Sequence, residues 1–470
     1  MLGAQKALTF NDVILLPSFT QIEPSEAKVS TNFTRRIRLN VPFASAPMDT
    51  VTESKMAIAL ARVGGIGILH RNCTIEEEVN EARKVKRAEA LIIRDVITIE
   101  PDKLVREAIE LMRKHNIHGL PVIEEGKLVG IVTWRDVRFA NSEAKVKDVM
   151  SKNVITASEE ISIEEAKRIL HEHRIEKLPI VDKDGKLIGL ITVRDIEGRG
   201  KYPNAVRDEA GRLVCGAAIS PFDLERAKAL DKWVDVLVID VAHFHNENCM
   251  KATKKLLKEV ESEIVVGNIG TYEACEDCIT KLDGIAGLRV GIGSGSICTT
   301  GVVTKVAAPT LFAVCSVADA CRDYGAKLPI IADGGIKTPG DVALALAAGA
   351  SSVMMGNIFA GCEESPGMLV AIEGRYYKQY YGMGSHAARR KRMKFDRYMA
   401  KQIEEGVEGW VPFRGSVESV VREFVAGLKA AMGYVGARSI EELWEKAKFA
   451  LVTERGMKEI KPHSLITPRY

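Results

Sequence analysis

The chain has 470 residues, of which 46% are hydrophobic and 27% charged, and its formal net charge is +3. This length exceeds one ordinary hydrophobic core and predicts two or more domains. So small a net charge gives no reason to expect nucleic acid or a membrane surface as a partner, and no apolar run approaches the ~18 residues of a membrane span.

The nine cysteines are scattered, and Cys275 and Cys278 form a lone C-x-x-C pair. A lone pair is weak support for a metal, because a structural zinc site takes four ligands. An odd and dispersed set of cysteines indicates a reducing compartment, and we therefore expect a cytoplasmic protein.

Residues 1–91 show the rhythm of a parallel α/β fold. Strand-like runs at 8–17 and 41–48 precede a helical pattern that begins near Thr52 and stops at Gly64-Gly65, and residues 66–70 read as another buried strand. Strand, helix, glycine stop and strand is the order of a βαβ unit.

Residues 92–199 interrupt this rhythm with a tandem repeat. Residues 96–98 recur as 154–156, residues 119–123 as 177–181, and residues 130–136 as 189–195. Amphipathic helical patterns lie between the matching segments of each copy. Because several segments match in register, the sequence predicts two copies of a βαββα unit, at 92–147 and 148–199.

Each copy closes on Gly-x-x-Thr-x-Arg-Asp, and the pair resembles a tandem CBS module. The resemblance implies that the module binds adenine or guanine nucleotides, with Thr133, Asp136, Thr192 and Asp195 at ribose-contacting positions. The alternative is a structural spacer whose aspartates cap helices.

After residue 200 the βα rhythm resumes, with buried strands expected at 234–240, 264–269, 286–290, 329–333 and 352–355. Together with residues 1–91 this gives about eight strand–helix repeats, enough to close a (β/α)₈ TIM barrel, so the fold class is α/β. The barrel is expected from residues 1–91 and 200–470. Polar residues or glycines follow each strand, where barrel enzymes place their chemistry.

The loop at 290–300 carries three glycines at alternate positions and then Cys298, which is flanked by hydroxyl side chains. Glycines at this density allow tight turns that bring backbone amides close to an anion. Such amides favour the thiolate, so Cys298 is a candidate nucleophile. The alternative is a buried, inert cysteine on a glycine-rich turn.

Asp333-Gly-Gly335 and Gly356-Asn357 follow two successive late strands. Backbone amides at these ends, with the Ser296 hydroxyl, are predicted to hold a phosphate, as late-strand loops do in such barrels. Asp333 accepts hydrogen bonds and suits a ribose diol. The alternative for both glycine positions is simple turn geometry.

These motifs resemble the IMP dehydrogenase / GMP reductase family over nearly the whole chain. The resemblance implies that Cys298 attacks C2 of a purine nucleotide, and that Asp240, Asn268, Gly291 and Gly293 lie on the NAD side. The nucleotide would contact Ser45, Met48, Ser296, Asp333, Gly335, Gly356, Asn357, Tyr380, Met383, Gly384 and Glu405.

Residues 386–414 form a charged segment, for which a solvated loop is the plain interpretation. The basic cluster lacks the interleaved aromatic residues of an RNA-binding surface. In IMP dehydrogenases the corresponding segment is a flap with an Arg-Tyr dyad, which Arg397-Tyr398 match. The resemblance implies that Arg397 activates the hydrolytic water with help from Thr300 and Tyr398.

Three departures from the dehydrogenase pattern keep GMP reductase, which uses NADPH, as an alternative. Gly301 replaces the usual Arg, Glu459-Ile-Lys461 replaces a C-terminal Glu-Ser-His that helps bind potassium, and the flap is shorter. The potassium ion itself would lie on the backbone of Gly293, Gly295 and Cys298. A nucleotide sensor without turnover is the second alternative.

The dehydrogenase is favoured because the dyad has a purpose only if water must attack. His243 and His245 lack a third ligand at fixed spacing, so a transition-metal site is rejected. The family resemblance also implies a homotetramer, with octamers through the tandem module.

Overall fold

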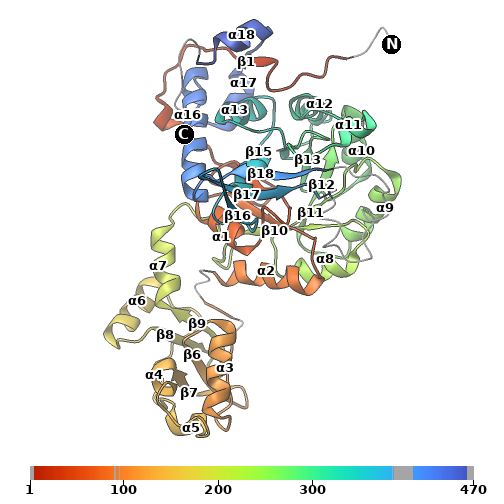
Figure 1. Ribbon diagram of the computed structural model, residues 1–470. Coiled ribbons are helices and arrows are strands. Elements are labelled where there is room, and N and C mark those ends of the chain that lie inside the picture. The colour runs from red at the N-terminus through yellow and green to blue at the C-terminus, as the bar shows by residue number, and fades with distance from the viewer. Residues whose placement is uncertain (1–4, 89–91, 95, 384, 386–405, 463–470) are drawn as a thin grey trace. The chain divides into compact units, whose positions relative to one another are not determined.

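The computed structural model describes residues 5–88, 92–94, 96–383, 385 and 406–462 (Figure 1). The chain divides into two compact units. The first comprises Met1–Lys86, Asn204–Asp208 and Leu213–Tyr470, and the second comprises Arg87–Pro203 and Glu209–Arg212.

The first unit is built on a closed barrel of eight parallel strands, which confirms the predicted fold class. In barrel order the strands are β10 (Cys215–Ile219), β11 (Val236–Ile239), β12 (Glu263–Ile269), β13 (Gly287–Val290), β14 (Ile330–Asp333), β15 (Ser352–Met355), β4 (Phe43–Ser45) and β5 (Ile66–Leu69). Most are short runs of apolar residues buried on both faces, as parallel strands covered by helices require.

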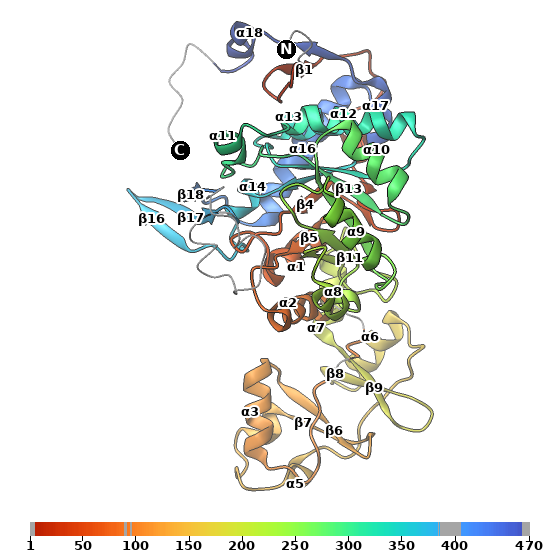
Figure 2. The ribbon, with the colours of Figure 1, turned by 90° about the vertical axis from the view of Figure 1, so that its right-hand side faces the viewer.

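Helices surround this barrel in Figures 1 and 2. They are α1 (Ser54–Arg62), α2 (Ile75–Arg87), α8 (Leu224–Asp231), α9 (Glu247–Leu256), α10 (Tyr272–Lys281), α11 (Thr300–Thr304), α12 (Thr310–Asp323), α13 (Pro339–Ala347), α14 (Asn357–Ala360) and α16 (Val417–Val435). Polar residues begin several of them: Asp223, Asn246, Thr271 and Thr338 each accept a backbone N–H of the first turn. Gly64, at φ +107°, ends the turn between α1 and β5 as predicted.

Apolar side chains fill the barrel interior and leave space at one end. A hairpin of β2 (Thr31–Asn32) and β3 (Arg38–Leu39) packs Phe33 and Leu39 into the core. Thr34 of this hairpin donates to Glu263, the first residue of β12, so the hairpin closes the amino-terminal end. The carboxyl-terminal end therefore remains for a site.

The remaining elements of this unit flank the barrel. An antiparallel sheet contains β16 (Leu369–Ile372), β17 (Arg375–Tyr381) and β18 (Glu408–Pro412). The first two strands precede the predicted flap at 386–414, and β18 falls within its last part. The outer elements are η1 (Pro24–Glu26), α17 (Ile440–Lys446), α18 (Glu454–Glu459) and the pair β1 (Val13–Leu15) with β19 (Phe449–Leu451).

The second unit consists of two similar copies, each with its own buried apolar cluster. The first copy contains α3 (Val105–His115), β6 (Gly119–Glu124), β7 (Lys127–Thr133), α4 (Trp134–Val137) and α5 (Val146–Val149). The second contains α6 (Ile163–Glu172), β8 (Lys177–Val181), β9 (Leu187–Thr192) and α7 (Val193–Lys201). The first strand predicted for each βαββα copy is reduced to a single parallel bridge, at Ile99 with Val122 and at Ala157 with Ile180.

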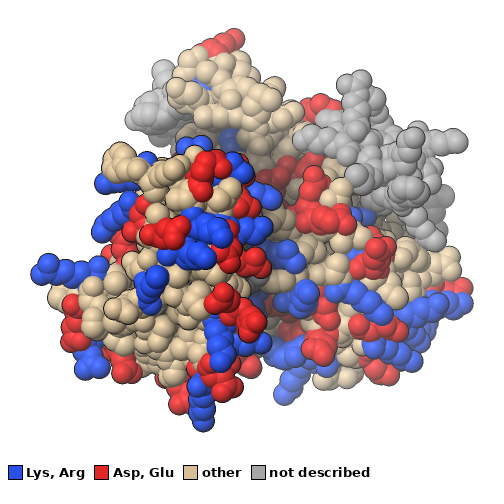
Figure 3. Space-filling view, turned by 90° about the horizontal axis from the view of Figure 1, so that it is seen from below, with Lys and Arg blue, Asp and Glu red and all other residues tan. Residues whose placement is uncertain are grey.

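The surface charge agrees with the small net charge of the sequence. Lys and Arg side chains intermingle with Asp and Glu over the face drawn in Figure 3. Among the residues that the structure describes, no helix has both the length and the apolar composition to cross a membrane.

Candidate active site

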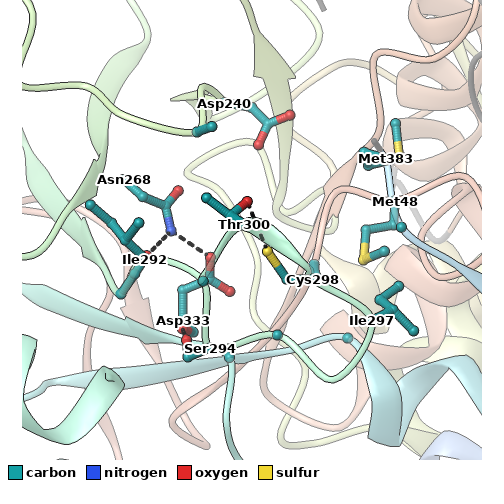
Figure 4. A pocket seen from close by; sticks show the side chains of 18 of the residues that line it. Met48, Asp240, Asn268, Ile292, Ser294, Ile297, Cys298, Thr300, Asp333 and Met383 are labelled. Atoms are coloured by element: carbon teal, nitrogen blue, oxygen red, sulfur yellow. Dashed lines mark hydrogen bonds between the residues drawn. The ribbon is translucent and has the colours of Figure 1, made fainter. Parts of the chain in front are cut away.

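A pocket opens at the carboxyl-terminal ends of the barrel strands, where the sequence predicted the chemistry (Figure 4). Its volume is about 1140 Å³ with the open mouth included. Its wall includes the residues Met48, Asp240, Asn268, Arg289, Gly291, Gly293, Gly295, Cys298, Thr300, Asp333, Gly356, Tyr380 and Met383.

The loop after β13 brings Cys298 into this wall. Gly291 has φ +132°, and a Cβ there would stand 2.5 Å from the Asp333 carbonyl oxygen, so both conformation and space require glycine. The Cys298 N–H donates to the Gly295 carbonyl at 3.0 Å. The Cys298 sulfur is half-buried and lies 3.3 Å from Thr300 Oγ1.

Residues 406 and 407, which belong to the predicted flap segment 386–414, pack against this loop. Cys298 pairs with Gly406 in an isolated antiparallel bridge, and the Val407 N–H donates to the Ile297 carbonyl at 3.1 Å. The Gly382 N–H in turn donates to the Val407 carbonyl at 3.1 Å. Gly382, which precedes the predicted flap segment, and Val407, which lies within it, are thereby held beside the cysteine loop.

The carboxylates of Asp240 and Asp333 are joined by the side chain of Arg289. Arg289 Nη1 lies 2.8 Å from Asp240 Oδ1, and Nε lies 2.9 Å from Asp333 Oδ2. Asn268 Nδ2 donates to the same Asp333 oxygen at 2.8 Å, as the dashed line in Figure 4 shows. Arg71 is a second cation beside Asp240. Its Nε lies 3.5 Å from Asp240 Oδ2, and its Nη2 donates to the Asp240 carbonyl oxygen at 3.0 Å.

Of the residues predicted to hold a phosphate, Ser296, Gly356 and Asn357 lie close together, whereas Gly335 lines a separate pocket. Asn357 Nδ2 donates to Ser296 Oγ at 3.2 Å, and a Cβ on Gly356 would stand 2.6 Å from the Tyr380 hydroxyl. Burial raises the pKa of Tyr380, so its phenol keeps its proton at neutral pH and can donate a hydrogen bond. Gly335 lines an adjoining pocket together with Phe10 and Lys337.

Ser45 was predicted to contact the nucleotide, and the structure places it behind the pocket wall. Its side chain is fully buried, and its hydroxyl accepts a hydrogen bond from Thr52 at 2.8 Å. The pocket wall at this point is formed by the next residues, Ala46, Pro47 and Met48. Four further predicted site residues lie outside the described residues: Gly384, Arg397, Tyr398 and Glu405.

In the second unit, Asp136 caps a helix, as the spacer interpretation expected. Its Oδ2 accepts hydrogen bonds from the Thr133 N–H and hydroxyl, both at 2.7 Å. Thr192 ends β9, and position 195 falls in α7. The nearby Lys177 is half-buried, and burial together with the cations Arg194 and Arg135 lowers its pKa.

Sequence reasoning missed Arg289 and Arg71. A charged residue inside the otherwise apolar run of β13 was a signal, because a buried arginine is rarely left without partners. It also missed that Asp49 accepts from Tyr381 at 2.8 Å and from Asn72 at 2.9 Å, which fixes the end of β17 to the loop after β4.

His245 contacts a carboxylate, with Nε2 3.0 Å from Asp277 Oδ2. Within the described ranges no group of three or more His, Cys, Asp or Glu side chains is arranged to hold a metal ion.

Comparison with known proteins agrees with this geometry. The family model of the IMP dehydrogenase / GMP reductase domain matches residues 7–463. The chain is 58% identical over 462 residues to the inosine-5'-monophosphate dehydrogenase of Korarchaeum cryptofilum, which covers 98% of this chain and 97% of the relative. It is 48% identical over 484 residues to that of Methanocaldococcus jannaschii, with 99% and 97% covered.

Among solved structures, a variant GMP reductase of Trypanosoma brucei in complex with guanosine 5'-monophosphate has a TM-score of 0.90 at 36% identity, with 99% of both chains covered. The GMP reductase of the same organism in complex with guanosine 5'-triphosphate has a TM-score of 0.79 at 33% identity, with 96% of this chain and 99% of the other covered.

Proposed function

Because the chain belongs to the IMP dehydrogenase / GMP reductase family, we propose that it oxidises IMP to XMP with NAD, a step of guanine nucleotide synthesis. The observation that carries this proposal is the placement of Cys298 in one pocket with Asp333 and Asp240. Two carboxylates suit the ribose diols of two nucleotides, so the pocket is equipped for a mononucleotide and a dinucleotide together.

The substrate is held so that C2 of its purine faces the Cys298 sulfur. Ser296, Gly356, Asn357 and Tyr380 supply donors for the phosphate, and Asp333 accepts from the ribose. Met48 and Met383 are apolar groups of the wall near Cys298 in Figure 4 and suit the purine ring. Ser45, Gly335, Gly384 and Glu405 complete the proposed set of substrate residues.

The proposed chemistry is covalent redox catalysis on Cys298. The thiolate adds to C2 of IMP, the C2 hydride leaves, and a thioimidate between Cys298 and the purine remains. NAD, when bound beside Asp240, Asn268, Gly291 and Gly293, supplies the hydride acceptor. Water then attacks C2 and the carbon–sulfur bond breaks. One hydrogen of the water remains on XMP, the other is released as a proton, and the Cys298 thiolate is regenerated.

Hydrolysis requires a base, and we assign this role to Arg397 with Tyr398 and Thr300. Thr300 is the described member of this set, and its hydroxyl contacts the Cys298 sulfur. An arginine acts as a base only where its surroundings disfavour the cation, which a closed and dry site provides.

The reductase alternative is supported by the likeness to GMP reductase structures. In that reaction the same cysteine attacks GMP, ammonia leaves, and NADPH delivers hydride to give IMP. The greater identity to dehydrogenases, 58% against 36%, favours the oxidation of IMP.

An absorbance assay at 340 nm separates these functions. The dehydrogenase produces NADH from IMP and NAD, and the reductase consumes NADPH with GMP. No signal in either assay, with a melting shift on adding nucleotide, would favour a sensor without turnover. Cys298→Ser should abolish either reaction, and Arg397→Ala should slow hydrolysis while hydride transfer continues; a fully active Cys298→Ser variant would refute the mechanism.

For the second unit we propose a tandem CBS module that binds adenine or guanine nucleotides. Support comes from Lys177, which pairs with Thr192 between β8 and β9, and from Arg135 and Arg194, each two residues after Thr133 and Thr192. Glu176, 3.6 Å from Arg135, offsets part of this positive charge. Asp136 and Asp195 are the proposed ribose acceptors. Calorimetry with ATP and GTP tests this, and Asp136→Ala should weaken whichever nucleotide binds.

We further propose a potassium ion on the carbonyls of Gly293, Gly295 and Cys298, and a cytoplasmic homotetramer that pairs into octamers. Backbone carbonyls are ligands that potassium takes in proteins. If the enzyme were equally active in potassium, sodium and lithium chloride, the proposed potassium site would be wrong. Light scattering with and without nucleotide tests the assembly.

A further inference from the structure

Two buried thiols that the proposed reaction does not use meet between α10 and α12. The sulfur atoms of Cys275 and Cys321 are 3.6 Å apart, although 46 residues separate them in sequence. Cys275 is completely buried, and Cys321 is 7% exposed. The pair is thus a contact between two helices that pack side by side on the barrel.

The side chains point across the helix interface. Cys275 Sγ lies 3.6 Å from the Val317 carbonyl oxygen, which belongs to α12 one turn before Cys321. A disulfide has sulfurs about 2.05 Å apart. Closing the bond therefore requires a movement of about 1.5 Å shared by two side chains that already face each other.

The surroundings make one of these thiols the attacking group. The hydrogen bond with Cys275 lowers the pKa of Cys321, and the same bond together with burial raises the pKa of Cys275. Cys321 is also the more exposed of the two. The pKa of Cys278, one turn further along α10, is raised by burial as that of Cys275 is, so the sulfur contact with Cys321 and not the pKa distinguishes Cys275 from Cys278.

Cys275 and Cys321 stand on either side of the catalytic loop in the sequence. The segment from Cys275 to Cys321 contains β13, the loop of Cys298 and α11. Thr310, at the start of α12, has its hydroxyl 2.7 Å from Ser294 Oγ and 3.0 Å from the Asp333 carbonyl oxygen. A bond between the helices would thus close a ring around the whole catalytic segment without entering the pocket.

We propose that Cys275 and Cys321 form a reversible disulfide that stabilises the catalytic segment under oxidising conditions. The oxidant is a small-molecule disulfide, for which glutathione disulfide is the probe. The Cys321 thiolate attacks one of its sulfurs and releases one glutathione thiolate. Cys275 then attacks the Cys321 sulfur, loses its proton and releases the second glutathione, so two protein thiols are oxidised and one disulfide is reduced.

The test treats the folded, full-length protein with glutathione disulfide and maps its peptides without reduction. We expect a cross-linked peptide pair joining Cys275 to Cys321, lighter by two hydrogens than the free thiols. We also expect a higher melting temperature, because the ring restricts the unfolded chain. Dithiothreitol should reverse both changes.

Matched variants identify the sulfurs involved. Cys278→Ser should still form the link and gain stability, whereas Cys275→Ala and Cys321→Ser should show neither, although each melts cooperatively in reducing buffer. Absence of the link in the folded protein, its formation only after unfolding, a link through Cys278, or a link that does not raise the melting temperature would each overturn the proposal.

Discussion

Arg289 holds Asp333 through a hydrogen bond of 2.9 Å between Nε and the carboxylate Oδ2. The same guanidinium reaches Asp240 through Nη1 at 2.8 Å. Arg289 is 9% exposed, so neither bond is weakened by much solvent. The two carboxylates that we assign to different nucleotides therefore share one rigid, buried cation.

Arg289→Lys should weaken the binding of both nucleotides. A lysine offers one point charge in place of the planar fork, so it cannot keep both carboxylates oriented. A lost charge-assisted hydrogen bond is worth about 1.5–3 kcal/mol, which predicts a fall in kcat/KM of roughly 10- to 100-fold for IMP and for NAD. Steady-state kinetics with each substrate varied in turn provides the measurement.

Arg71→Lys is the matched control. Arg71 contacts Asp240, through the carboxylate Oδ2 and the carbonyl oxygen, whereas Arg289 contacts both carboxylates. It should raise the KM for NAD with little change in that for IMP. If Arg289→Lys altered one KM alone, the shared-cation interpretation would be wrong.

The barrel and the location of its site could be predicted because they depend on local patterns. Buried apolar runs followed by glycine or a carboxylate identified β11, β12 and β14, and barrel closure places such ends together. The partner of Asp333 could not be predicted, because it depends on which strands become neighbours. The contact of Ser45 could not be predicted for a related reason: its hydroxyl accepts a hydrogen bond from Thr52, seven residues later in the chain.

Thr300→Val should separate the two halves of the reaction. The Thr300 hydroxyl lies 3.3 Å from the Cys298 sulfur, and in our mechanism it assists the attacking water. Removing it should leave the first turnover of NADH nearly intact but slow the steady-state rate by about 10²-fold, the lower end of general acid–base effects. Stopped-flow absorbance at 340 nm would show a burst followed by a slow phase.

Thr299→Val is the control for that experiment, since the Thr299 side chain makes no capping hydrogen bond to α11. Its steady-state rate should stay close to that of the wild type. Loss of the burst in Thr300→Val would instead place Thr300 in the first half-reaction.

Lys86→Met should destabilise the barrel unit severely. Lys86 Nζ is buried and lies 2.6 Å from Asp235 Oδ2 and 3.0 Å from Asp208 Oδ2. Burial alone would lower the pKa of Lys86, but these carboxylates raise it overall. Without the cation the two largely buried carboxylates lose the positive charge that they share, and breaking such a pair costs about 3–5 kcal/mol.

Lys84→Met, two residues earlier in α2, is the comparison. Lys84 is half exposed and pairs with Glu81, so its loss should cost less than about 1 kcal/mol. Urea unfolding of both variants measures the difference. Equal destabilisation by the two substitutions would contradict the importance of the buried cluster.

The buried carboxyl of Glu78 should make stability fall as pH rises. Glu78 contacts Arg226, yet complete burial raises its pKa from 4.5 to about 8. Between these two pH values the folded protein retains a proton that the unfolded chain has lost. The contribution to the free energy of unfolding is therefore full below pH 4.5, declines by at most about 1.4 kcal/mol per pH unit, and is lost above pH 8.

Glu78→Gln keeps the shape of the side chain and removes the titration. The melting temperature of the wild type relative to this variant should therefore decrease from pH 5 to pH 8. Because the comparison is made between variants at each pH, the other titrating groups cancel. A difference that stays constant with pH would mean that Arg226 keeps Glu78 ionised in the folded protein throughout this range.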